Sequence, residues 1–114
     1  MGIADVDRVT ALLVLLCAAL FEAGGDALVR SGLRAASPWT RVGLLSSGAV
    51  VLFAYGVLVN TPRWEFGRLL GIYVVFFFVV AQLISWLAFD QPPTRLVWLG
   101  GACIVLGGVI LSLG

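Results

Sequence analysis

Long apolar stretches, separated by short polar segments, dominate this chain. Four of them approach the twenty or so residues that a helix needs to cross the hydrocarbon core of a bilayer. They cover residues 9–29, 42–58, 69–89 and 96–113. The connections between them are too short to form a soluble domain. The pattern therefore predicts an all-α membrane protein, with four transmembrane helices in a single domain over residues 1–114.

The composition argues against a soluble protein. Apolar residues make up 61% of the 114 residues and charged residues only 11%, whereas soluble domains carry about 25% charged residues. All seven basic residues are arginines, and the chain contains no histidine. Because the chain offers no basic soluble surface, we expect no binding to nucleic acid. The lipid bilayer is the partner that this composition predicts.

One carboxylate, that of Glu22, lies inside the first apolar run. A charged side chain at the centre of a spanning helix costs about 2.5–3.5 kcal/mol on insertion scales, so it usually faces a partner or a water-filled cavity. Asp26 and Arg30 follow at intervals of four residues, which places all three on one helix face. We interpret Asp26 and Arg30 as an ion pair at the helix end. Glu22, which is deeper, is the leading candidate for binding substrate or proton, and Asp26 is a second candidate.

Polar residues in the second and third spans supply candidate partners for this acid. Tyr55 and Ser46 in the second span could hydrogen-bond the Glu22 carboxylate, although a tyrosine near a helix end is also typical of an interface anchor. Tyr73 in the third span is followed by three consecutive phenylalanines, and such rings could contact a bound cation through their faces. We therefore predict that Glu22, Asp26, Tyr55, Tyr73 and Ser46 form the binding site.

The fourth span carries no charge and is rich in glycine. Gly101 and Gly108 are two helical turns apart and lie on the same face, with Gly107 beside them. Small residues on one face allow helices to approach closely, which is how helices associate where no hydrophobic effect separates them from lipid. The pattern predicts that this helix serves assembly and takes no part in the binding site.

The arginines are divided almost equally between the two sides of the membrane. With four spans, one side holds three of them and the other side four, so the excess of basic residues that usually sets orientation is nearly absent. Either the chain inserts in both orientations or a partner protein fixes its orientation. We favour the first, which predicts an antiparallel, dual-topology homodimer. The two sets are Arg8, Arg63 and Arg68 on one side, and Arg30, Arg34, Arg41 and Arg95 on the other.

These features together make the chain similar to the small multidrug resistance proteins of the drug/metabolite transporter superfamily. The likeness extends over residues 15–113. It is carried by Phe21-Glu22-Ala23, by Ser85-Trp86, and by the segment Gly101-Ala102-Cys103-Ile104-Val105-Leu106-Gly107-Gly108-Val109. The motif Phe66-Gly67-Arg68, followed by Tyr73, also resembles the related YnfA-like small membrane proteins.

The resemblance implies a transporter. Glu22 would bind cationic substrate and proton in turn, and Tyr73 would line the same pocket. Gly101 and Gly108, with Gly107, would form the dimer interface. The function implied is proton-coupled antiport of small, cationic molecules across a bacterial inner membrane, by a homodimer without cofactor or metal.

A charge pair between subunits is an alternative for the acid. In an antiparallel dimer, Arg68 of one subunit would come to the same end as Glu22 of the other. Such a pair would hold the carboxylate ionised and favour an anionic or zwitterionic substrate. Together with Arg30, which was assigned to Asp26 above, Arg68 is one of two candidate charge partners for the carboxylates of the first span.

A rival interpretation belongs to a different functional class. The chain could be a non-transporting accessory subunit of a larger membrane transporter or of a flippase for lipid-linked sugars, with its charges serving only as structural pairs. An enzyme is not expected, because the sequence has no histidine, no nucleophile paired with a base, no phosphate-binding loop and no metal-ligand spacing.

Overall fold

The computed structural model describes residues 3–114, with side chains from Asp7 onward, as four α-helices joined by short turns. The helices are α1 (Ile3–Leu33), α2 (Pro38–Val59), α3 (Phe66–Phe89) and α4 (Arg95–Ser112). All four are long and apolar enough to cross a membrane. The prediction of an all-α protein with four potential transmembrane helices is confirmed.

The helices extend beyond most of the apolar runs, because apolarity marks the part of a helix in hydrocarbon and not the ends of its backbone. Local chemistry defines these ends. Pro38 occupies the first turn of α2, where its missing N–H is not needed. Thr94 caps α4 by accepting a hydrogen bond from the Val97 N–H at 3.3 Å. α3 ends where Asp90 adopts a left-handed conformation with φ of 54°, a common helix terminator.

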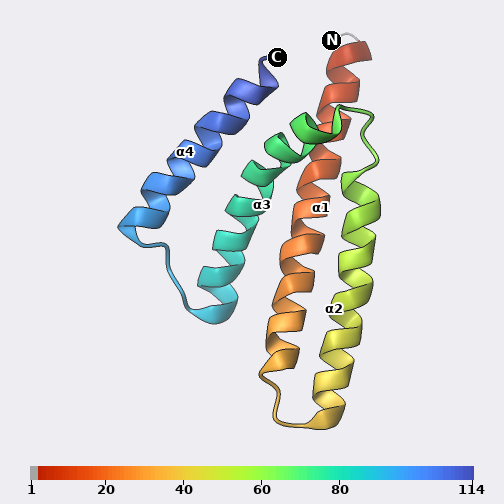
Figure 1. The fold of residues 1–114 in the computed structure, drawn as a ribbon, viewed down its shortest axis with the longest axis vertical. Coiled ribbons are helices and arrows are strands. Elements are labelled where there is room, and N and C mark those ends of the chain that lie inside the picture. The colour runs from red at the N-terminus through yellow and green to blue at the C-terminus, as the bar shows by residue number, and fades with distance from the viewer. Residues whose placement is uncertain (1–2) are drawn as a thin grey trace.

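Helix α1 is the element against which α2 and α3 both pack (Figure 1). α2 returns antiparallel to α1 and makes the most extensive contact with it, while α3 packs on another part of α1. α4 packs mainly on α3 and leans away from the α1–α2 pair. The start of α1, the start of α3 and the end of α4 lie at one end of the molecule.

Two glycines allow the close approach of α1 and α2. A Cβ atom at Gly48 would lie 3.0 Å from the carbonyl oxygen of Gly25 and 2.7 Å from Cγ2 of Val29. A Cβ atom at Gly25 would in turn lie 2.8 Å from Cγ of Leu52. Both distances to side chains are shorter than packed carbon atoms tolerate. The absence of side chains at these positions therefore sets the spacing of the helix pair.

Gly101 and Gly108 of α4 pack against α3 of the same chain, and a role of this helix in a dimer interface stays a prediction. Gly101 faces Phe78 of α3, where an added Cβ would lie only 2.6 Å from the ring. Gly108 faces Val75 of α3 and is also buried. Gly107 lies on the exposed side of the helix. The small-residue face was recognised correctly as a packing face, but its partner is α3 of the same chain.

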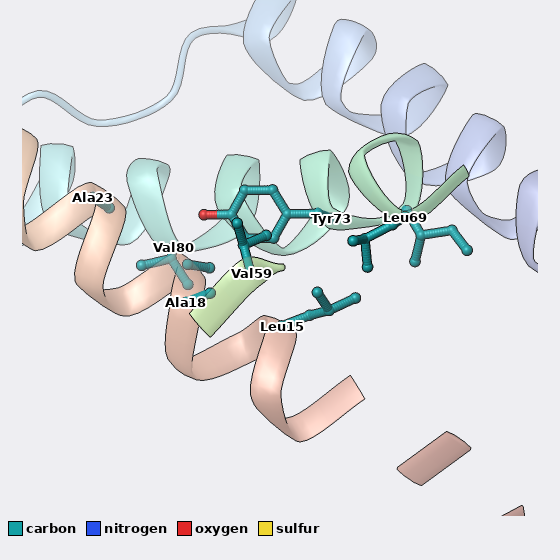
Figure 2. Close-up of a cluster of buried hydrophobic side chains, with 9 residues drawn as sticks. Leu15, Ala18, Ala23, Val59, Leu69, Tyr73 and Val80 are labelled. Atoms are coloured by element: carbon teal, nitrogen blue, oxygen red, sulfur yellow. The ribbon is translucent and has the colours of Figure 1, made fainter. Parts of the chain in front are cut away.

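Small residues on α1 bring α3 close to it in the core (Figure 2). Ala18 and Ala19 are fully buried, and Tyr73 of α3 is only 4% exposed. Figure 2 shows the Tyr73 ring within this cluster, with its hydroxyl pointing toward the turn of α1 that holds Ala23. The cluster comprises Leu15, Ala18, Ala19, Ala23, Val59, Leu69, Ile72, Tyr73 and Val80. The core therefore places a tyrosine hydroxyl beside the middle of α1.

We expect Gly48→Leu to lower the free energy of unfolding by about 1–3 kcal/mol, the usual cost of overpacking a tight contact. Gly43→Leu is the matched control, because it lies in the same helix and an added Cβ there meets nothing within 4 Å. Denaturation of the detergent-solubilised protein with SDS, followed by circular dichroism, measures both. Equal stability of the two variants would contradict the close packing of α1 on α2.

Candidate functional site

The centre of the candidate site is a hydrogen bond between α1 and α3. The Tyr73 hydroxyl donates to Oε1 of Glu22 at a distance of 2.8 Å. Glu22 follows Ala18 and Ala19 by one turn, so the face that packs on α3 also presents the carboxylate. Sequence analysis placed these two residues in one binding site, and the structure brings their side chains into direct contact.

Aromatic rings surround this hydrogen bond. The rings of Tyr55 from α2 and Tyr73 have their centroids 5.7 Å apart, with an interplanar angle of 32°. The Phe77 ring, one turn beyond Tyr73, lies 6.3 Å from it. Tyr55 lies near enough to Glu22 for an electrostatic interaction with its carboxylate. Three of the four helices thus contribute side chains to this site, with aromatic rings beside the Glu22–Tyr73 hydrogen bond.

Asp26 does not form the predicted ion pair with Arg30, which corrects the sequence-based interpretation. The Arg30 guanidinium lies 5.1 Å from the centroid of the Phe89 ring, over its face. Asp26 is exposed on α1. The i, i+4 spacing allowed a pair but did not require it, because an aromatic face from α3 competes for the guanidinium. Asp26 is therefore left as a second carboxylate near Glu22.

A hollow of about 250 Å³ adjoins the site between α1 and the second half of α3. Ala23 and Phe77, which flank the Glu22–Tyr73 group, line one part of it. Polar side chains line the remainder, together with apolar ones. The lining comprises Ala23, Asp26, Ala27, Arg30, Phe77, Ala81, Ile84, Ser85, Phe89 and Gln91. The hollow thus extends along α1 between Arg30 and Ala23, the residue next to Glu22.

Arg68, the other candidate charge partner, contacts α4 in this chain. Its Nε donates to the Leu111 carbonyl at 3.0 Å, and its Nη2 lies 3.5 Å from the Ser112 carbonyl. A cation at the end of a helix satisfies carbonyls that have no partner in the helix and complements the helix dipole. Pairing between subunits stays untested, but it would have to compete with these bonds.

Ser46 is not part of this group. Its side chain is exposed, and it lies about two and a half helical turns before Tyr55 in α2. The antiparallel register explains the separation, because Gly48 already packs opposite Gly25 and Val29, beyond Glu22 along α1. The sequence alone did not reveal how α2 is aligned against α1. Phe89 was the contributor that sequence analysis missed, and an aromatic at a helix end gave no signal of its role.

The arrangement can hold a proton or a cation. A carboxylate with a hydroxyl donor on one side has further lone pairs available. Aromatic faces nearby attract cations through their quadrupoles. Among the described residues, no group of three or more Asp, Glu, Cys and His residues could hold a metal ion.

Comparison with known proteins gives a family match over most of the chain. The family described as "Uncharacterised BCR, YnfA/UPF0060 family" matches residues 8–114. The UPF0060 membrane protein YfjF of Bacillus subtilis is 35% identical over 102 residues, covering 83% of this chain and 91% of its own. A UPF0060 membrane protein of Streptomyces avermitilis is 39% identical over 100 residues, covering 84% of this chain and 83% of its own. No solved structure matches the chain.

We expect Glu22→Ala and Tyr73→Phe to be energetically coupled. An intramolecular hydrogen bond contributes about 1 kcal/mol to stability, so the free energies of unfolding should depart from additivity by about that amount. Glu65→Ala combined with Tyr73→Phe is the control pair. Glu65 is the exposed N-cap residue of α3, and distant sites add within about 0.5 kcal/mol. Additivity of the Glu22 and Tyr73 changes in SDS denaturation would exclude a significant bond.

Proposed function

The chain belongs to the YnfA/UPF0060 family of membrane proteins, and we propose that it is a proton-coupled transporter of small organic cations. In this proposal Glu22 is the site that proton and cation occupy in turn. The family match and the named relatives make the chain an integral membrane protein. The transport activity and the link to small multidrug resistance proteins are our inference.

One observation carries the proposal: a carboxylate within the membrane-spanning part of α1 is bonded to a tyrosine and not to an arginine. Tyr73 donates a hydrogen bond to Glu22, and no ion pair joins Glu22 to an arginine among the described side chains. A structural carboxylate within a membrane is usually neutralised by a basic partner. The absence of such a partner among the described side chains supports a role in binding a mobile cation.

Competition for one carboxylate is sufficient to couple two opposed movements. Burial disfavours the ionised form of a carboxylate, so a proton neutralises the empty site. A cation that enters stabilises the ionised form and displaces the proton. Because the two cannot occupy Glu22 together, inward movement of one is linked to outward movement of the other.

The surrounding residues fit a cation with an apolar or planar body. The rings of Phe77 and Tyr55 lie beside that of Tyr73, and cation–π contacts strengthen when the site is shielded from water. The Tyr73 hydroxyl donates to one oxygen of the carboxylate, and a carboxylate has further lone pairs that can face a ligand. This favours organic cations over small, strongly hydrated ions.

We propose in addition that two copies assemble as an antiparallel dimer. Glu22 is only partly buried in a single chain, and a second copy would complete its enclosure. The nearly equal division of arginines between the two membrane faces supports insertion in both orientations. A partner protein in place of the second copy is the accessory-subunit alternative.

We expect purified protein to release protons when tetraphenylphosphonium or guanidinium is added, and Glu22→Gln to abolish this release. The amide retains the shape of the side chain but cannot exchange a proton. A pH-sensitive dye in weakly buffered detergent solution measures the release.

Glu65→Gln is the matched control, because it makes the same chemical change at an exposed position outside the spans. It should release protons as the native protein does. If the native protein released none, the proposal of a shared proton and cation site would be refuted.

Asp26→Asn should weaken cation binding about two- to fivefold without abolishing proton release. Asp26 lies one turn from Glu22 and lines the adjoining hollow, so it contributes attraction through partly exposed space, where such interactions are small. Titration of proton release against cation concentration gives the affinity. Complete loss in Asp26→Asn, with release retained in Glu22→Gln, would transfer the site from Glu22 to Asp26.

A further inference from the structure

A second polar hollow lies near the start of α1, at the opposite end of this helix from the hollow that Asp26 and Arg30 line. It has a volume of about 510 Å³ and is formed where the starts of α1 and α3 meet the end of α4. Its lining comprises Asp7, Arg8, Leu12, Arg63, Trp64, Glu65, Arg68, Ile72 and Ser112. The candidate spans begin at Asp7 and Phe66 and end at Ser112 here. The hollow is thus at the level where lipid headgroups meet hydrocarbon.

Three arginines from different segments converge on this hollow. Arg8 comes from α1, Arg63 from the α2–α3 connection and Arg68 from α3. Asp7 and Glu65 also line it, but no ion pair joins them to these arginines among the described side chains. Like charges gathered at one place repel one another unless an anion neutralises them. Three arginines and two carboxylates line the hollow, which gives it a net charge of +1, and the absence of ion pairs among these described side chains favours an anionic ligand for the arginines.

Two of the three guanidinium groups are already fixed in position. Nη2 of Arg8 donates to the Ser112 carbonyl at 2.8 Å, and Arg68 donates to the carbonyls of Leu111 and Ser112. Each guanidinium has five N–H donors, so both retain donors for a further acceptor. Because these two side chains are already ordered, less side-chain entropy is lost when an anion binds. Arg63 makes no hydrogen bond within the described part of the chain and is available to a ligand.

We propose that this hollow binds the phosphate group of an anionic phospholipid. Guanidinium groups match phosphate oxygens in geometry and charge, and basic pockets between transmembrane helices bind lipid headgroups. Trp64 at the rim suits the headgroup region. Leu12 and Ile72 line the same hollow and would contact the glycerol and upper acyl carbons. A lipid fits these apolar walls, which free phosphate would leave unfilled.

Such a lipid would hold α4 to the rest of the molecule. α4 packs mainly on α3, and its last turn is held by Arg8 and Arg68 through carbonyl oxygens. An anion shared by the three arginines would tie α1, the α2–α3 connection and α3 together around that last turn. This role is independent of transport at Glu22.

Retention of phosphatidylglycerol, compared with phosphatidylcholine of the same acyl chains, tests the site by native mass spectrometry of the detergent-solubilised full chain. We expect preferential retention of phosphatidylglycerol, weakened about fivefold in Arg63→Gln, since each basic residue near an anionic surface contributes about that factor. Arg63 is chosen because it bonds to nothing else in the described structure, so the fold should survive. Arg95→Gln is the control, an exposed arginine at the other end of the bundle.

Inorganic phosphate added in excess distinguishes the two sources of the ligand. Phosphatidylglycerol retained against millimolar phosphate supports the lipid. Displacement by phosphate alone would instead identify a site for the free anion and overturn the lipid assignment. Equal retention of both lipids, or equal loss in Arg63→Gln and Arg95→Gln, would overturn the site itself.

Discussion

A carboxylate inside a bilayer must find its hydrogen-bond donors within the protein, because hydrocarbon offers none. In this chain the bond from Tyr73 to Glu22 meets that requirement. It depends on the close approach of α1 and α3, which the fully buried Ala18 and Ala19 permit one turn before Glu22. Larger residues there would separate the two helices and leave the acid without its donor. The hydrogen bond at the site therefore depends directly on the close packing of the core.

Glycine sets the remaining helix contacts by the same means. Gly25 and Gly48 bring α2 against α1, which carries Tyr55 to the side of Tyr73. Gly101 brings α4 against α3, away from the acid. Since apolar side chains gain little by leaving lipid for a protein interior, close backbone approach is the main source of helix affinity. The small residues thus decide which helices enclose the acid and which do not.

Sequence was sufficient for features that depend on one helix at a time. Four spans follow from apolar length, and Glu22 stands out by its depth. Features that depend on a second helix could not be derived in this way. Spacing brought Asp26 and Arg30 together, but Phe89 of α3 attracts the guanidinium. Spacing also placed Gly101 on a packing face without saying that Phe78 would fill it. Which side chain from a neighbouring helix a residue contacts depends on how the two helices are aligned and tilted. The sequence of one helix does not contain that information.

The charges of the chain are separated in a way that bears on the site. Arg8 and Arg68 bond to the carbonyl oxygens at the end of α4, and Arg30 lies over an aromatic ring. Each of these arginines has its contact with a carbonyl oxygen or an aromatic ring and not with a carboxylate. Because attraction between unit charges is strong in a medium of low polarity, one arginine near Glu22 would neutralise it permanently. Carbonyl oxygens and an aromatic ring hold these arginines near the ends of the helices. Glu22 therefore stays able to bind a mobile cation.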